Sequence, residues 1–95
     1  MFNKKDIANN IKHIPEKPGV YQYYDNHKKI LYVGKAKNLK KRISSYFTKR
    51  KQNKKTKKLV EKISSINYVL VKSEMDALLL ENNLIKKHKP KYNVL

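Results

Sequence analysis

Short stretches in which hydrophobic and polar residues alternate predict the strands of this chain. Residues 20–24 are the first, rich in aromatic and β-branched side chains, a composition typical of strands. Residues 30–33 form the second, and the polar turn-forming residues 25–29 between them predict a β-hairpin over residues 20–34. Residues 66–71 predict a third strand, which can extend the hairpin into a small sheet.

Longer stretches with apolar residues three or four positions apart predict helices. In residues 3–14 the apolar stripe is isoleucine, and in residues 38–47 it follows Asn38, a favourable N-cap residue. A capping box at Ser73 opens a long helix that ends before Pro90. These segments predict an α+β fold with a small antiparallel three-stranded sheet (hairpin plus one strand) flanked by helices. The predicted helices are residues 3–14, 38–47, 56–64 and 73–88, and a non-helical tail follows at residues 91–94.

The length of 95 residues suffices for one small domain, so residues 1–95 are interpreted as a single unit. No stretch is apolar enough to span a membrane, and the N-terminus lacks the pattern of a signal peptide. The chain has no cysteine, which excludes disulfides, thiolate zinc sites and cysteine nucleophiles. We therefore expect a cytoplasmic protein.

The net charge of +17, with a pI near 10.1, predicts a polyanionic partner. Nucleic acid is the first candidate and an anionic membrane surface the second, although a lysine-rich genome composition explains the excess equally well. Of the 24 basic residues only Arg42 and Arg50 are arginines. Lysine attracts phosphate without reading bases, whereas the planar fork of Arg42 suits bidentate phosphate contact. The basic, non-apolar residues 48–58 predict a solvated linker or a DNA-contacting loop.

Glu81 stands apart among the seven carboxylates. On a helix its neighbours three or four positions away are Leu78, Leu84 and Ile85, so the carboxylate lies at the edge of an apolar face. A metal ion or a buried lysine can compensate such a charge, and a plain amphipathic boundary residue is the alternative. The sequence offers no paired carboxylates and no His/Cys ligand set, which leaves a one-ion Mg²⁺ or Mn²⁺ site as the metal option.

Two tyrosine-glycine segments frame the predicted hairpin. Gly19-Val20-Tyr21 lies at its start and Tyr32-Val33-Gly34 at its end, and these are the only two glycines of the chain. Tyr21 and Tyr32 come close if both point to one face of the hairpin. The glycines suit a close backbone approach or a positive φ. A plain β-hairpin with turn glycines explains the same spacing.

Taken together, four blocks in this order resemble the GIY-YIG nuclease signature. They are Pro18 to Tyr21, residues 31–47 with the run from Gly34 to Phe47, residues 74–85, and residues 89–93. Within that superfamily the chain most resembles the N-terminal nuclease domain of the bacterial excinuclease UvrC, and the resemblance covers about residues 14–95. It implies the GIY-YIG fold type, and we expect either a domain excised from a longer protein or a short relative of it.

The resemblance also implies roles for individual residues. Tyr32 would help to activate the attacking water, which needs a cation nearby, and Lys35 is the expected one. Arg42 would hold the scissile phosphate, Glu81 would be the sole protein ligand of the metal ion, and Asn93 would fix the site from the C-terminal tail. The full catalytic set is Tyr21, Tyr32, Lys35, Arg42, Tyr46 and Asn93. The expected DNA-binding residues are Lys37, Lys40, Lys41, Arg50, Lys51, Lys54 and Lys55.

The function implied by the resemblance is metal-dependent hydrolysis of a DNA phosphodiester bond on the 3′ side of a lesion. The pathway would be nucleotide excision repair, with damaged duplex DNA as substrate, UvrB as partner, UvrA as an indirect partner, and a link to the SOS response. We expect one Mg²⁺ or Mn²⁺ ion and a monomeric domain. Two alternatives stay open: a non-catalytic basic nucleic-acid-binding module, and another GIY-YIG nuclease of the structure-specific or homing type.

Overall fold

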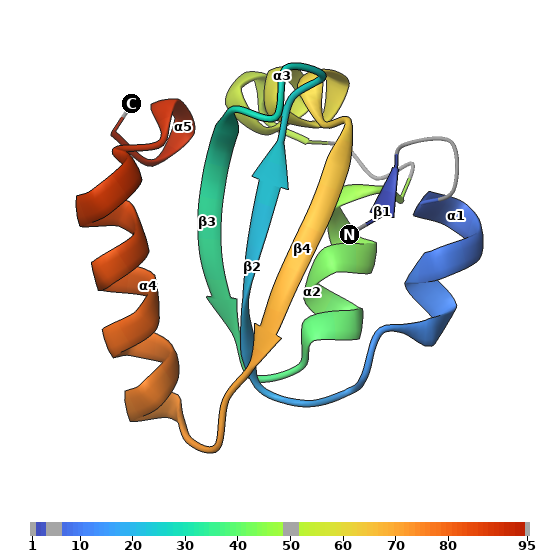
Figure 1. Ribbon diagram of the computed structural model, residues 1–95. Coiled ribbons are helices and arrows are strands. Elements are labelled where there is room, and N and C mark those ends of the chain that lie inside the picture. The colour runs from blue at the N-terminus through green and yellow to red at the C-terminus, as the bar shows by residue number, and fades with distance from the viewer. Residues whose placement is uncertain (1, 4–6, 49–51, 95) are drawn as a thin grey trace.

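A four-stranded antiparallel sheet organises the computed structural model, which describes residues 2–3, 7–48 and 52–94. The strands are ordered β1-β4-β2-β3 across the sheet (Figure 1). The three longer strands confirm the predicted hairpin and third strand, whereas the two-residue strand at the edge was not predicted. Their bounds are β1 Phe2–Asn3, β2 Gly19–Tyr24, β3 Ile30–Ala36 and β4 Ser65–Leu70.

The β2–β3 hairpin sets which side chains share a face. Tyr21 lies opposite Gly34 and Tyr23 opposite Tyr32, before a bulge shifts the register beyond Tyr23. The turn is held by Asp25, whose Oδ1 accepts from the backbone N–H groups of residues 27 and 29 at 2.8 and 2.9 Å. This Asx-type turn is the physical basis of the predicted hairpin.

The N-terminal helical segment is shorter than predicted. Instead of one helix over residues 3–14, α1 covers Ile7–Asn10 and a 3₁₀ turn, η2, covers Ile11–His13. Asparagine is a weak helix former, and the residue before a proline is pushed out of the α region. Ile14, which precedes Pro15, is accordingly extended with ψ of 130°. The start of the predicted helix coincides with β1, and residues 4–6 lie outside the described part.

The three longer helices begin at side-chain N-caps, of which Asn38 and Ser73 were predicted and Asn53 was not. Asn38 Oδ1 accepts from Lys41 N at 3.0 Å at the start of α2, and Ser73 Oγ accepts from Asp76 N at 3.1 Å at the start of α4. Asn53 caps α3, which begins inside the stretch predicted as a basic linker or loop. Their bounds are α2 Leu39–Tyr46, α3 Lys54–Lys62 and α4 Glu74–His88.

The C-terminal residues form a short helix, α5 (Lys91–Val94), where the sequence predicted an irregular tail. Lys89 ends α4 in the left-handed conformation, with φ of 45°, a frequent way to stop a helix. Pro90 then favours a new helical turn because its φ is already helical. The α5 helix packs against β3, so the chain end returns to the hairpin.

The sheet separates two cores of different composition. On one side, beneath α1 and α2, the buried residues include Tyr21, Tyr23 and Ile43. On the other side α4 covers Val20, Val33 and its own Ala77. Figure 1 shows α4 on one side of the strands and α1 and α2 on the other. The hairpin therefore presents an aromatic face to one layer and an aliphatic face to the other.

Candidate active site

Four tyrosines gather on the aromatic face of the hairpin. Tyr21, Tyr23 and Tyr32 come from β2 and β3, and Tyr46 comes from the last turn of α2. The ring centroid of Tyr21 lies 6.1 Å from that of Tyr32 and 5.8 Å from that of Tyr46. We call these four residues the tyrosine cluster. The structure thus confirms that Tyr21 and Tyr32 share a face.

Arg42 is fixed by two phenols of the tyrosine cluster. Its Nε donates to Tyr21 Oη at 3.3 Å and its Nη2 donates to Tyr46 Oη at 3.2 Å, while the two phenol oxygens are 2.9 Å apart. The guanidinium carbon also lies 5.0 Å from the ring centroid of Tyr46. Since a guanidinium has five N–H donors, three remain for a ligand, and Arg42 is exposed on its outer side. The side chain is oriented before any substrate arrives.

Gly34 is required because the Tyr21 ring lies directly on it. A Cβ atom at Gly34 would be 2.3 Å from both Cζ and Oη of Tyr21, closer than van der Waals contact permits. Neither glycine of the chain has a positive φ. The glycine of this hairpin therefore makes room for the phenol of the neighbouring strand rather than for a turn.

The environment keeps the Tyr21 and Tyr32 phenols protonated at neutral pH. Burial raises the pKa of Tyr32, proximity to Tyr46 raises it further, and the charge of Arg42 opposes the effect. Burial likewise raises the pKa of Tyr21 well above that of a free phenol, with Tyr46 as the next cause. Burial lowers the pKa of Arg42, but the hydrogen bond to Tyr21 and the electrostatic influence of Tyr21, Tyr46 and Tyr32 together outweigh it, and the net shift is upward. In its free state the site thus contains the neutral phenols of Tyr21 and Tyr32 and the permanent cation of Arg42.

Glu81 borders this site from α4. The negative charge of Glu81 is among the causes that raise the pKa of Tyr32, so the carboxylate and the phenol lie within electrostatic reach. Glu81 is half-buried. Within the described ranges no group of three or more His, Cys, Asp or Glu residues could hold a metal ion. A hard cation that takes one carboxylate and fills its remaining positions with water and phosphate oxygens fits this donor set.

Asn93 binds the backbone of β3 next to Tyr32. Its Oδ1 accepts from Val33 N at 2.8 Å and its Nδ2 donates to Val33 O at 2.9 Å. These are the outward-facing groups of an edge strand, which otherwise lack a partner. These contacts are those of a positioning residue, and the expected role of Asn93 in the reaction stays a prediction.

Lys35 lies away from the tyrosine cluster. It is opposite Val20 in the register, on the α4 side of β3, whereas Tyr32 is on the other side. The cation that acts on the Tyr32 phenol is Arg42, which corrects the expectation that Lys35 is its neighbour. The physical reason is the alternation of strand side chains, which puts residues three apart on opposite faces.

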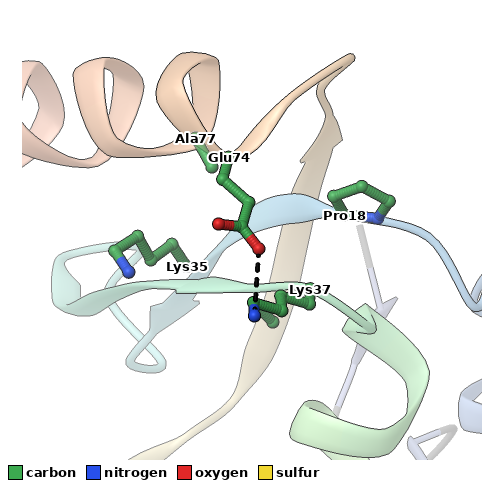
Figure 2. Close-up of a pocket in the computed structure, with 6 residues that line it drawn as sticks. Pro18, Lys35, Lys37, Glu74 and Ala77 are labelled. Carbon is green, nitrogen blue, oxygen red and sulfur yellow. Dashed lines mark ion pairs between the residues drawn. The ribbon is translucent and has the colours of Figure 1, made fainter.

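A pocket of about 210 Å³ surrounds Lys35 at the start of α4. Figure 2 shows Lys35, Lys37 and Glu74 around it, with Pro18 and Ala77. Lys37 Nζ lies 3.1 Å from Glu74 Oε1, and both side chains are exposed. Lys35 and Lys37 thus form a basic stretch on the end of β3 and the loop after it.

The other expected DNA-binding residues fall on two helices. Lys40 and Lys41 lie on α2, and Lys54 and Lys55 lie on α3. Arg50 and Lys51 lie outside the described residues. Sequence reasoning missed Tyr23, a full member of the tyrosine cluster whose ring centroid is 5.0 Å from that of Tyr46. Its two-residue spacing from Tyr21 was the available signal, because strand residues two apart share a face.

The topology and the phenol–guanidinium site on a tyrosine-glycine hairpin define the class, a GIY-YIG-type domain. The family model described as the UvrC-like GIY-YIG domain matches residues 17–94, and the chain belongs to this family. UvrABC system protein C of Bacteroides fragilis is 62% identical over 85 residues, which are 90% of this chain and 14% of the relative. The protein of the same name in Cytophaga hutchinsonii is 54% identical over 96 residues, which are 100% of this chain and 16% of the relative.

Solved structures of the GIY-YIG N-terminal endonuclease domain of UvrC from Thermotoga maritima have the same fold. The domain bound to magnesium as its catalytic divalent cation superposes with a TM-score of 0.83 at 38% identity, covering 94% of this chain and 97% of that chain. A tyrosine-to-phenylalanine variant bound to its catalytic divalent cation gives a TM-score of 0.86, covering 97% and 99%. Separately, none of the described helices of this chain is long and apolar enough to cross a membrane.

Proposed function

We propose that this chain is a divalent-metal-dependent DNA endonuclease domain that hydrolyses a phosphodiester bond. The observation that carries the proposal is Arg42, which two phenols hold in place. Its charge and that of Glu81 both act on the Tyr32 phenol, so the three groups lie within electrostatic reach of one another. The net charge of +17 supplies the general attraction to DNA. Membership of the UvrC-like GIY-YIG family and the likeness to an endonuclease domain support the same reaction class.

In this reaction a water oxygen bonds to phosphorus, the bond from phosphorus to one ester oxygen breaks, and the departing oxygen takes up a proton. Negative charge accumulates on the phosphoryl oxygens in the transition state. The fixed guanidinium of Arg42 faces that charge, and it needs no reorientation because Tyr21 and Tyr46 already hold it. Tyr21 is therefore a positioning residue, whereas Arg42 contacts the phosphate.

Tyr32 is the phenol best placed to orient the water. It is half-buried, whereas Tyr21 and Tyr23 are fully buried. Its raised pKa leaves it protonated in the free domain, so there it acts as a hydrogen-bonding group for the water. Its use as a base needs added positive charge near the phenol. Glu81 would hold the divalent cation, which when bound supplies that charge and polarises the phosphoryl oxygen.

The pathway is proposed from the relatives. The chain spans only 14–16% of the length of the UvrABC system proteins C described above. We assign to it incision on the 3′ side of a lesion in nucleotide excision repair, with UvrB as direct partner and UvrA as indirect partner. The domain would work in the cytoplasm as a monomer with one Mg²⁺ or Mn²⁺ ion. Lys37, Lys40 and Lys41 would contact the flanking DNA backbone, and Lys35 would reach a phosphate from the α4 side of β3.

The test is nicking of supercoiled plasmid at low salt with Mg²⁺ or Mn²⁺. Glu81→Gln removes the proposed ligand charge, and Glu74→Gln on the same helix is the matched control because Glu74 pairs with exposed Lys37. We expect Glu81→Gln to lower the nicking rate by about 10²-fold or more while metal-free DNA binding is retained. Glu74→Gln should nick within about twofold of wild type.

Equal, metal-dependent nicking by wild type and Glu81→Gln would remove Glu81 from the site. If neither nicks the plasmid, the assay is repeated on lesion-bearing duplex with the UvrA and UvrB proteins. Continued silence there, with DNA binding intact, would contradict the nuclease proposal and favour a basic module that only binds nucleic acid.

A further inference from the structure

A cavity of about 330 Å³ lies between α3 and α5, away from the tyrosine cluster. Five of the six residues that line it are lysines and none is acidic. We call it the lysine pocket. Its lining residues are Lys54, Lys55, Lys58, Lys62, Lys91 and Tyr92. Several ammonium groups around one cavity repel one another, and an anion inside the cavity relieves that repulsion.

Two features show that the lysine pocket is a built arrangement rather than a scatter of surface charge. Lys54, Lys58 and Lys62 are spaced by four residues on α3, so they line one side of the helix. The buried ring of Tyr92 forms the base, with Lys62 Nζ 5.7 Å and Lys91 Nζ 5.9 Å from its centroid. These cation–π contacts hold two ammonium groups over the same ring from two helices.

Lysines are unfavourable in the first turn of a helix, where acidic residues are stabilising. Lys54 and Lys55 occupy the first turn of α3, which contains no acidic residue. The positive end of the helix dipole lies there and disfavours cations. The lysines add to that positive potential instead of compensating it, so the N-terminal end of the lysine pocket is the more attractive to a phosphate group.

The lysine pocket is joined to the candidate active site by α5. Tyr92 precedes Asn93, which binds the Val33 backbone next to Tyr32. Figure 1 shows α3 and α5 at the same end of the sheet, where β3 begins. A DNA strand with its scissile phosphate at Arg42 can therefore continue from β3 towards α3.

Lys54, Lys58 and Lys62 form a row along α3 whose length suits several phosphates of one DNA strand. The helix rises about 12 Å over the eight residue steps from Lys54 to Lys62. Successive phosphates of one strand are about 3.4 Å apart along the duplex axis, so the row can face about three of them. Lysine gives such contacts without reading bases, as a nuclease that cuts at varied sequences requires.

We propose that the lysine pocket is a second phosphate-binding site, which holds the backbone of the DNA strand that flanks the scissile phosphate. The proposal rests on the proposed function for its ligand. It assigns Lys58, Lys62 and Lys91 to DNA binding in addition to Lys54 and Lys55, with Tyr92 as the residue that positions two of the ammonium groups. It gives the domain a fixed direction for the bound strand.

The experiment measures DNA binding by the full 95-residue chain without metal, so that no cleavage is needed. The pocket variant combines Lys54→Gln, Lys58→Gln and Lys62→Gln. The matched control combines Lys12→Gln, Lys17→Gln and Lys72→Gln, three exposed lysines outside the pocket. A third variant replaces the three pocket lysines by arginine and preserves the charge. Fluorescence anisotropy of a labelled duplex gives Kd between roughly 50 and 300 mM salt, the range over which counterion release is measurable.

We expect the pocket variant to reduce the slope of log K against log salt by about two to three, since each lost phosphate contact removes about 0.9. Its Kd at low salt should rise at least tenfold more than that of the control variant, which has the same net charge. The arginine variant should keep the wild-type slope. Equal effects of the pocket and control variants would overturn the proposal, because net charge alone would then explain binding.

The nicking assay keeps this proposal separate from the proposed function. The pocket variant should have a higher KM for DNA than wild type, because the lysines bind substrate and transition state alike. Its kcat, measured at saturating DNA, should stay within about threefold of the wild-type value. Suppose that only the pocket variant loses slope, and that neither wild type nor any variant nicks plasmid or lesion-bearing duplex with the UvrA and UvrB proteins. That result would support the lysine pocket and contradict the nuclease. Normal nicking with equal slopes would support the nuclease and contradict the lysine pocket.

Discussion

The two faces of the β2–β3 hairpin use the same strands for different purposes. On the α2 side, Tyr21 and Tyr32 present hydroxyl groups within a buried ring cluster, and Arg42 lies among them. On the α4 side, Val20 and Val33 pack against Ala77 without a polar atom. One residue of the strand separates the two chemistries, because successive side chains point to opposite faces. A slip of one residue in register would exchange them.

The comparison teaches where stability and chemistry reside in this small domain. The aliphatic face buries carbon atoms, and each methyl group removed from water stabilises the folded state. The aromatic face also buries phenol hydroxyls, which lose hydration and need partners. Tyr21 and Tyr46 satisfy each other and Arg42, and the resulting network orients the guanidinium. Substitutions on the two faces should therefore separate activity from stability.

The largest effect on both properties is expected for Gly34→Ala. The new methyl group would meet ring atoms of Tyr21 at 2.3 Å, and that ring is fully buried. The ring must move, and overpacking of this kind costs about 1–3 kcal/mol of folding free energy. Displacing the phenol also frees the Nε of Arg42, and a misplacement of about 1 Å can lower a rate by about 10²-fold. Denaturant unfolding and plasmid nicking measure the two losses.

Gly19→Ala is the control for that experiment. A Cβ atom there would meet Leu39 Cδ1 at 2.4 Å and Val69 O at 2.5 Å, so folding is again destabilised. Tyr21 is not among these neighbours, so we expect nicking per folded molecule to remain within about threefold of wild type. If Gly34→Ala nicks like Gly19→Ala, the position of the Tyr21 ring is unimportant for the reaction.

On the aliphatic face, Val20→Ala should change stability alone. Val20 is fully buried between β3 and α4, and losing two methyl groups costs about 2 kcal/mol of folding free energy with the cavity included. The value of kcat should remain within about twofold, since no polar group of the site touches this side chain. Val69, opposite Val20 in the register and 42% exposed, is the control: Val69→Ala should cost less than about 0.5 kcal/mol. A large fall in kcat for Val20→Ala would contradict the separation of the two faces.

Much of the fold could be predicted because its determinants are local. The N-caps at Asn38 and Ser73 act over three residues, and the hairpin turn depends on Asp25 and its neighbours. The 3₁₀ turn at residues 11–13 and α5 were not predicted, since each depends on a proline and on packing from distant strands. The two-residue β1 pairs with Ser65 and Ile66, a long-range contact without a periodic signal.

The candidate site could be predicted only in part, because residue identity does not give direction. Tyr21, Tyr32, Arg42 and Tyr46 come together as expected, since strand and helix periodicity place them on facing surfaces. Lys35 was expected beside Tyr32 from sequence proximity, and the strand turns it to the other face. The lysine pocket depends on α5 returning to α3, which the local pattern of the chain does not encode.

The smallest effect is expected for Tyr23→Phe, which tests whether a hydroxyl on the aromatic face lacks a hydrogen-bond partner. Tyr23 is fully buried, and its hydroxyl has no hydrogen-bond partner among the described residues. An unpaired buried hydroxyl costs free energy that phenylalanine would not. Tyr23→Phe should therefore raise the free energy of unfolding by about 1 kcal/mol, with nicking unchanged. Tyr24→Phe is the control, because that less buried hydroxyl reaches Gln22 Oε1 at 3.4 Å and its loss should change stability by less than about 0.5 kcal/mol.

The pH dependence of the same variant gives a second readout. Burial, followed by proximity to Tyr21 and Tyr46, raises the pKa of Tyr23 in the folded state, whereas a tyrosine in the unfolded chain titrates near about 10. The folded chain then binds more protons than the unfolded chain above that pH. The stability linked to the neutral phenol is thus complete below about pH 10 and decreases as the pH rises further. Tyr23→Phe removes this proton, so its stability should fall less steeply above about pH 10, by up to about 1.4 kcal/mol per pH unit. An unchanged slope would mean that folding does not raise the pKa of Tyr23. A loss of stability at neutral pH would mean that the Tyr23 hydroxyl is paired.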